Sequence, residues 1–64
     1  PVDSRKMDNM EMEIQRQEAM LKMLTVEMNQ TPENYESIMA EYNQTKQKLE
    51  KLYNKWEEMA EMAE

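Results

Sequence analysis

Apolar residues recur in two stretches of the chain, and in both the gaps between them alternate between three and four residues. The first stretch, residues 6–28, contains the series Met7, Ile14, Leu21 and Met28 and the series Met10, Gln17 and Leu24. The second stretch, residues 31–62, is continued by Ala63 and contains Tyr35, Tyr42, Leu49 and Trp56 and also Ile38, Thr45, Leu52 and Met59. Such spacing places both series of a stretch on one narrow stripe of an α-helix, as in the seam of a coiled coil. Each stretch is therefore predicted to be a helix that needs a partner.

A proline lies between the two stretches and marks the start of the second helix. Pro32 pushes the residue before it out of the α conformation and suits the first turn of a helix. Thr31 is a suitable N-cap, and the carboxylates of Glu33 and Glu36 favour the positive end of the helix dipole. No Gly or Pro follows, so the second helix is predicted to continue almost to the end of the chain.

Helices are therefore predicted over about residues 5–29 and 32–62, with a turn at 29–31 and a frayed lead-in at 1–5. A connection that short folds the second helix back along the first. The predicted fold is an all-α, two-helix antiparallel coiled-coil hairpin that forms a single domain. The residues predicted to be most buried are Ile14, Leu21, Leu24, Ile38, Tyr42, Leu49, Leu52 and Trp56.

Charged residues beside the two stripes have opposite signs. Antiparallel pairing is predicted to bring Glu13 near Lys48. It is also predicted to bring Glu18 near Lys46. An exposed pair contributes only about 0–1 kcal/mol, but the signs favour pairing of the helices within the chain.

Methionine is frequent, with nine residues among 64. Four apolar residues lie outside the strict stripe of the first helix and are expected to widen its apolar face: Met12, Met20, Met23 and Val26. Methionines form soft surfaces that bind helices of varied sequence, although methionine also commonly replaces leucine in a seam. The candidate apolar partner surface consists of Met20, Met23 and Met39.

The chain has no His, Cys or Gly, which excludes most catalytic arrangements. Catalytic triads, thiolate or imidazole metal sites and glycine-rich phosphate loops all need those residues. A run of carboxylates near the end of the chain comprises Glu57, Glu58, Glu61 and Glu64. Such a run could bind a divalent cation weakly, but a solvated helix end is its more usual role. In this segment we expect no enzymatic activity, cofactor, metal or small-molecule substrate, and we expect a cytoplasmic protein without a membrane span.

The only concentrated positive charge lies in the second helix. Four lysines and one tyrosine are the candidate residues for binding nucleic acid or an acidic partner: Lys46, Lys48, Lys51, Tyr53 and Lys55. The lysines neutralise phosphates in this interpretation, and the tyrosine stacks on a base. Such a cluster more usually forms a solvent-exposed helix face with salt bridges. The net charge of −6 and a pI near 4.6 argue against strong independent binding of duplex nucleic acid.

A run within the second helix resembles a known domain. Residues 49–58 read Leu-Glu-Lys-Leu-Tyr-Asn-Lys-Trp-Glu-Glu, and they follow a Glu-rich helix and a Pro-Glu-Asn-Tyr turn at 32–35. Over about residues 10–60 the chain resembles the C-terminal coiled-coil domain of ABC-F ATPases of the Uup type.

This resemblance implies a hairpin at the C-terminus of a longer ATPase that acts on ribosomes in translation or antibiotic resistance. In that family two ATP-binding cassettes, which use ATP and Mg, precede the domain, and the hairpin contributes contacts to RNA, DNA or protein. The alternative is a free-standing structural or oligomerisation coiled coil that binds itself or another helical protein. Weak association of two hairpins is also predicted, because the pairing of two helices leaves apolar edges exposed.

Overall fold

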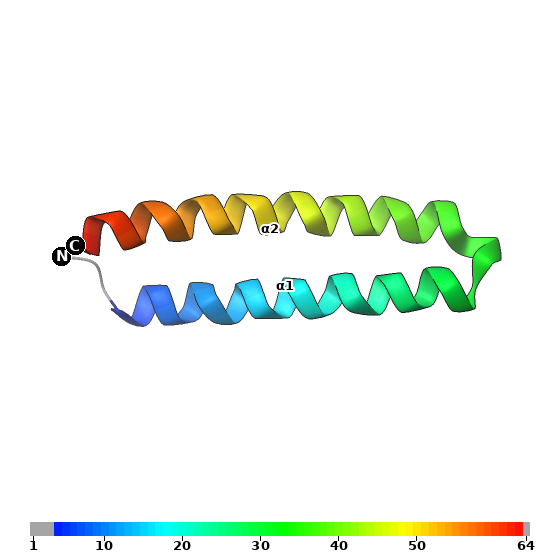
Figure 1. Ribbon diagram of the computed structural model, residues 1–64, viewed down its shortest axis with the longest axis horizontal. Coiled ribbons are helices and arrows are strands. Elements are labelled where there is room, and N and C mark those ends of the chain that lie inside the picture. Colours follow the sequence, from blue (N-terminus) through cyan, green and yellow to red (C-terminus); the bar gives the residue numbers. More distant parts are fainter. Residues whose placement is uncertain (1–3, 64) are drawn as a thin grey trace.

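The computed structural model describes residues 4–63, which form two long antiparallel helices joined by a tight turn (Figure 1). Helix α1 is Ser4–Gln30, a single 3-10 turn (η1) is Pro32–Asn34, and helix α2 is Tyr35–Ala63. The predicted all-α hairpin is confirmed. Ser4 and Arg5 are helical, and the rest of the predicted lead-in lies outside the described residues. The Cα atoms extend 49 × 15 × 11 Å, so the molecule is a narrow rod.

The turn is closed by backbone hydrogen bonds. The amide of Thr31 donates to the carbonyl oxygen of Glu27 at 2.8 Å and ends α1, while the amide of Asn34 donates to the carbonyl oxygen of Thr31 at 3.0 Å. The predicted N-cap is wrong in one respect, because the side chain of Thr31 makes no capping hydrogen bond. Pro32 follows it at the first position of the 3-10 turn, so the α-helix begins three residues later than predicted, at Tyr35.

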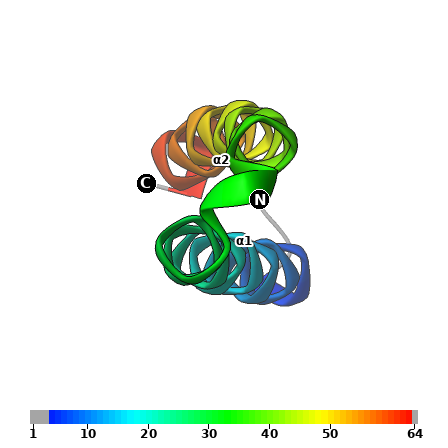
Figure 2. The same cartoon turned by 90° about the vertical axis from the view of Figure 1, so that its right-hand side faces the viewer.

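The core is a single seam between the two helices, which lie side by side in both views of Figures 1 and 2. Its buried residues are Ile14 and Leu24 from α1 and Ile38 and Leu49 from α2, with exposed fractions of 3–8%. The other four residues that were predicted to be most buried are only half-buried: Leu21, Tyr42, Leu52 and Trp56. A single partner helix covers one side of a stripe, so the residues at its edges keep contact with water.

One seam position differs from the prediction. Tyr35 is 51% exposed, although the heptad places it in line with Tyr42. Tyr35 is the first residue of α2 and lies beside the turn, where it lines an open groove with Met28 and Asn29 of α1. The other seam positions whose side chains the structure describes are buried or half-buried.

We predict that Leu24→Ala destabilises the hairpin by about 2–4 kcal/mol, because Leu24 is the most buried side chain and truncation leaves a cavity in a core with few other contacts. The free energy of unfolding is measured by urea titration with circular dichroism at 222 nm. Alanine favours helices more than leucine does, so any loss reports packing. The matched control is Met62→Ala, at a side chain that is 68% exposed. Equal stabilities of the two variants would contradict the assigned core.

Candidate interaction surfaces

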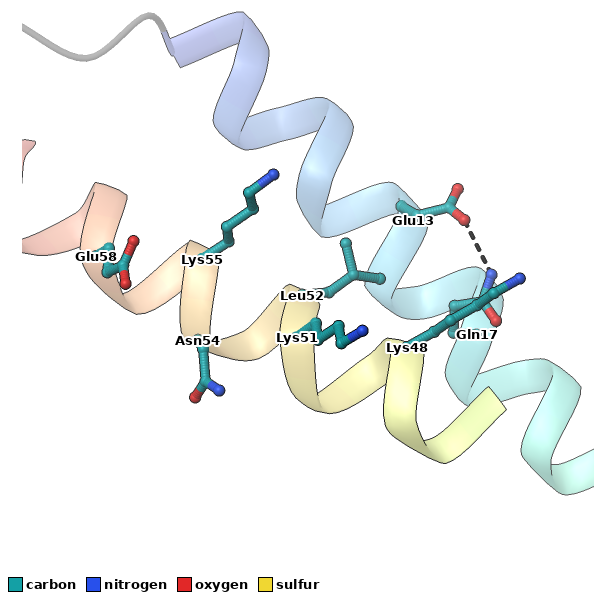
Figure 3. Close-up of a pocket in the computed structure, with 8 residues that line it drawn as sticks. All are labelled: Glu13, Gln17, Lys48, Lys51, Leu52, Asn54, Lys55 and Glu58. Atoms are coloured by element: carbon teal, nitrogen blue, oxygen red, sulfur yellow. Dashed lines mark hydrogen bonds between the residues drawn. The ribbon is translucent and has the colours of Figure 1, made fainter. Parts of the chain in front are cut away.

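The residues beside the seam form two different edges of the rod. On one edge, which we call the lysine flank, Lys48, Lys51 and Lys55 line a shallow groove between the helices (Figure 3). On the other edge, which we call the aromatic flank, Tyr53 and Trp56 line a second groove. Two such edges exist because a narrow seam divides the remaining surface of each helix in two.

The lysine flank has an apolar floor and a basic rim. Figure 3 shows Leu52 and Lys55 directed toward α1, while Asn54 points away from it. A neighbouring groove continues the flank toward the start of α1, where Lys6 and Met10 face Leu52 and Lys55. The flank therefore combines exposed ammonium groups with a strip of apolar side chains.

Two carboxylates, Glu13 and Glu58, line this flank, and neither forms an ion pair with its lysines. Glu13 accepts a hydrogen bond from the side chain of Gln17 at 2.9 Å and forms an ion pair with Arg16 at 3.3 Å, both within α1. Glu13 and Lys48 line the same groove, but no ion pair joins them. Within residues 4–63, none of the three ammonium groups of the lysine flank lies within 4.0 Å of a carboxylate. The positive charge is therefore available to a partner.

The aromatic flank holds the two helices together by hydrogen bonds across the seam. The hydroxyl of Tyr53 donates to a carboxylate oxygen of Glu18 at 2.6 Å. The indole Nε1–H of Trp56 donates to a carboxylate oxygen of Glu11 at 3.1 Å. The hydrogen bond to Glu18 raises the pKa of the Tyr53 hydroxyl above its ordinary value of 10.0, with smaller contributions from desolvation and from the charge of the carboxylate.

The structure does not bring all five candidate binding residues together. Lys48, Lys51 and Lys55 share one flank, but Tyr53 lies on the other and is held by Glu18. Lys46 precedes Tyr53 by one heptad, so it shares the side of Tyr53. The predicted proximity of Lys46 to Glu18 gives no ion pair, because Glu18 bonds to Tyr53 instead. The heptad positions of these residues, which can be read from the sequence, would have assigned them to different sides of α2. Their nearness in the sequence was misleading.

The candidate methionines also lie apart. Met39 is half-buried and lines a groove with Tyr35 and Tyr42, whereas Met20 and Met23 are 42% and 58% exposed on α1. Met12, Met20, Met23 and Val26, which the sequence placed outside the strict stripe of the first helix, are all exposed to solvent. Sequence analysis missed what this implies for α1, namely an apolar stripe outside the seam.

The acidic residues are dispersed along the rod. Within residues 4–63, no three carboxylates are grouped so that they could hold a metal ion. This range covers Glu57, Glu58 and Glu61, while Glu64 lies outside it. In the same range, no helix has both the length and the hydropathy to cross a bilayer.

The chain matches no protein-family model, no curated protein and no solved structure. The class of protein is therefore defined by the fold and its surfaces. It is a two-helix antiparallel hairpin with an open lysine flank and an internally bonded aromatic flank.

We predict that the hydrogen bond between Tyr53 and Glu18 makes stability fall at alkaline pH. A raised pKa in the folded state means that the folded hairpin holds the phenolic proton more tightly than the unfolded chain. The stabilisation is complete below pH 10.0 and is lost as the pH rises through the folded-state pKa. Unfolding free energies of the parent and of Tyr53→Phe should therefore differ at pH 8 and converge above pH 10.

The two proteins differ only at residue 53, so pH effects from the rest of the chain cancel in the difference. An ultraviolet titration provides a second measurement. The parent should contain one tyrosine that ionises at a raised pH, and this late step should be missing from Tyr53→Phe. A stability difference that stays constant from pH 8 to pH 11 would contradict the assigned bond.

Proposed function

We propose that this hairpin is a non-catalytic interaction domain whose lysine flank contacts an anionic surface of a large partner. The observation that carries the proposal is the row of Lys48, Lys51 and Lys55, which are exposed and make no ion pair. Neighbouring ammonium groups without anionic partners repel one another. A negatively charged partner would relieve this repulsion, so the lysine flank is suited to bind one.

The spacing of the lysines supports contact with an extended partner. Lys48 and Lys55 are one heptad apart, which corresponds to about 10 Å along a helix. Lys6 adds a further ammonium group where the groove continues. A row of this kind follows a chain of phosphates or an acidic helix better than it fits a small ligand.

The resemblance to the Uup-type coiled coil gives the proposal a biological setting. In that setting the hairpin belongs to a cytoplasmic ABC-F ATPase, whose cassettes bind ATP and Mg outside these 64 residues. The anionic surface is then ribosomal RNA, and the ATPase supplies most of the affinity. In this proposal the lysines contact RNA only through its phosphate charge. Stacking of Tyr53 on a base is not included, because Tyr53 is hydrogen-bonded to Glu18 and does not lie beside the lysines.

Binding by the hairpin alone should be weak and strongly dependent on salt. A net charge of −6 repels polyanions at long range, and only a few lysines act at contact. Each phosphate contact contributes a slope of about −0.7 to −0.9 to the dependence of log affinity on log salt concentration.

We predict that Lys51→Gln with Lys55→Gln weakens association with purified ribosomes roughly tenfold to fiftyfold near 0.1 M salt and reduces the salt slope by about two. Association is measured by fluorescence anisotropy of the labelled hairpin between about 50 and 200 mM salt, the range over which phosphate contacts are screened. The matched control is Lys22→Gln with Lys46→Gln, which removes the same charge from residues outside the lysine flank.

The two double variants separate a defined surface from a general charge effect. The control should retain the parental affinity and slope, and circular dichroism should show the same helicity in all three proteins. If both doubles lose affinity equally, or if neither does, the lysine flank is a solvated face and the proposal is overturned.

A further inference from the structure

A second heptad series runs along the back of α1, the side turned away from α2. Its members are Met12, Arg16, Ala19, Met23 and Val26, with successive gaps of four, three, four and three residues. All five side chains are exposed, and Met12, Met23 and Val26 are 61%, 58% and 51% exposed. Met20 borders the series and is 42% exposed. We call these six residues the back stripe.

The back of α2 shows what an ordinary solvated face looks like in this molecule. Its exposed residues at the corresponding heptad positions are almost entirely polar: Ser37, Ala40, Gln44, Gln47, Lys51, Asn54, Glu58 and Glu61. The two helices have similar lengths and contribute equally to the core, yet only α1 has apolar residues on both sides. A helix that is apolar on two opposite sides is typical of one that packs against two neighbours.

We propose that the back stripe binds the same stripe of a second copy, with the two α1 helices antiparallel, so that two hairpins form a four-helix assembly. A twofold interface pairs one surface with itself, and antiparallel packing places Ala19 opposite the partner's Met23 and Met23 opposite the partner's Ala19. Each layer then combines one small and one large side chain. The next layer outward on either side pairs Arg16 with the partner's Val26.

Charge complementarity favours this arrangement over the parallel one. In the antiparallel pair, Arg16 lies beside the partner's Glu27, which directly follows the partner's Val26. Arg16 already forms an ion pair with Glu13 of its own chain at 3.3 Å, so its guanidinium would lie between two carboxylates. A parallel pair would instead stack Arg16 on the partner's Arg16, which is repulsive. Lys22 lies at the border of the stripe, and its long side chain can extend into water.

The interface is small, and association should therefore be weak. Each copy contributes four large apolar side chains and one arginine network, which is below the size of stable dimer interfaces. We expect a dissociation constant on the order of 100 μM, as for transient complexes. This inference does not depend on the lysine flank.

Sedimentation equilibrium of the 64-residue chain from about 10 μM to 1 mM tests the association. The parent should pass from monomer to dimer, and Met23→Gln should remain monomeric with unchanged helicity, since its side chain already faces solvent in the hairpin. Met62→Gln is the matched control, because it makes the same change at a 68% exposed position outside the stripe and should dimerise normally.

Lys51→Gln with Lys55→Gln should also dimerise, which separates this inference from the proposed function. A parent that stays monomeric at 1 mM overturns the proposal.

Charge exchange tests the pairing. Arg16→Glu should weaken association at least tenfold, and the double variant Arg16→Glu with Glu27→Arg should restore it, because the exchanged charges meet only across the interface. The failure of the double variant to recover any affinity would reject the antiparallel pairing.

A cysteine tests the direction of the helices, and the chain has no other cysteine. In the antiparallel pair, residue 12 lies about 27 Å from residue 12 of the partner along the axis, so Met12→Cys should not form a disulfide-linked dimer under oxidation. Rapid crosslinking at this position would indicate parallel helices and would overturn the arrangement.

Discussion

Two helices can cover each other on one side only, and the rest of this structure depends on that limit. Among the described residues the seam buries just four side chains, two from each helix, and leaves residues such as Leu21 and Leu52 half-buried. A globular domain of the same length has several elements to close its core from different directions. Here the remaining surface is large relative to the core, and its chemistry decides what else the molecule contacts.

The edges of the seam show how hydrogen bonding and charge are distributed. On the aromatic flank, Glu18 and Glu11 accept hydrogen bonds from a phenol and an indole of α2. Rigid aromatic side chains span a seam with fewer rotatable bonds than lysine, so these contacts cost less conformational entropy than ion pairs. On the lysine flank two carboxylates line the groove, and one of them, Glu13, is engaged along α1 by Arg16 and Gln17. The other, Glu58, forms no ion pair with the lysines, so the positive charge of this flank stays unpaired within residues 4–63.

The fold could be predicted because two independent signals agree. Heptad spacing identifies the seam, and Pro32 identifies the point where the chain reverses, so neither needs knowledge of tertiary contacts. The partners of the flanking carboxylates could not be predicted in the same way. Exposed ion pairs contribute so little that a competing hydrogen bond from Tyr53 displaces the pairing of Glu18 with Lys46. That hydrogen bond shifts the partner of Glu18 along α2 by one heptad.

The candidate binding residues divide between the two flanks for a geometric reason. Tyr53 is two residues from Lys51 in the sequence, but two residues correspond to about 200° around a helix, which places them on different sides. The same rotation separates Met12 from Ile14, so Met12 could not widen the seam that Ile14 fills. Assigning every apolar residue to the nearest stripe concealed the second one. A heptad count started at Met12 instead of Met7 would have found it.

The separation of these surfaces has a consequence for binding strength. The back stripe faces away from α2, whereas the lysine flank lies at the junction of the helices, so contact at one surface leaves the other accessible. If both proposals hold, a twofold pair presents two lysine flanks to one partner, and the second flank binds at a high effective concentration once the first is engaged. By linkage, a partner that engages both flanks also stabilises the pair. Two interactions that are each weak alone would then reinforce one another, without a large core in either hairpin.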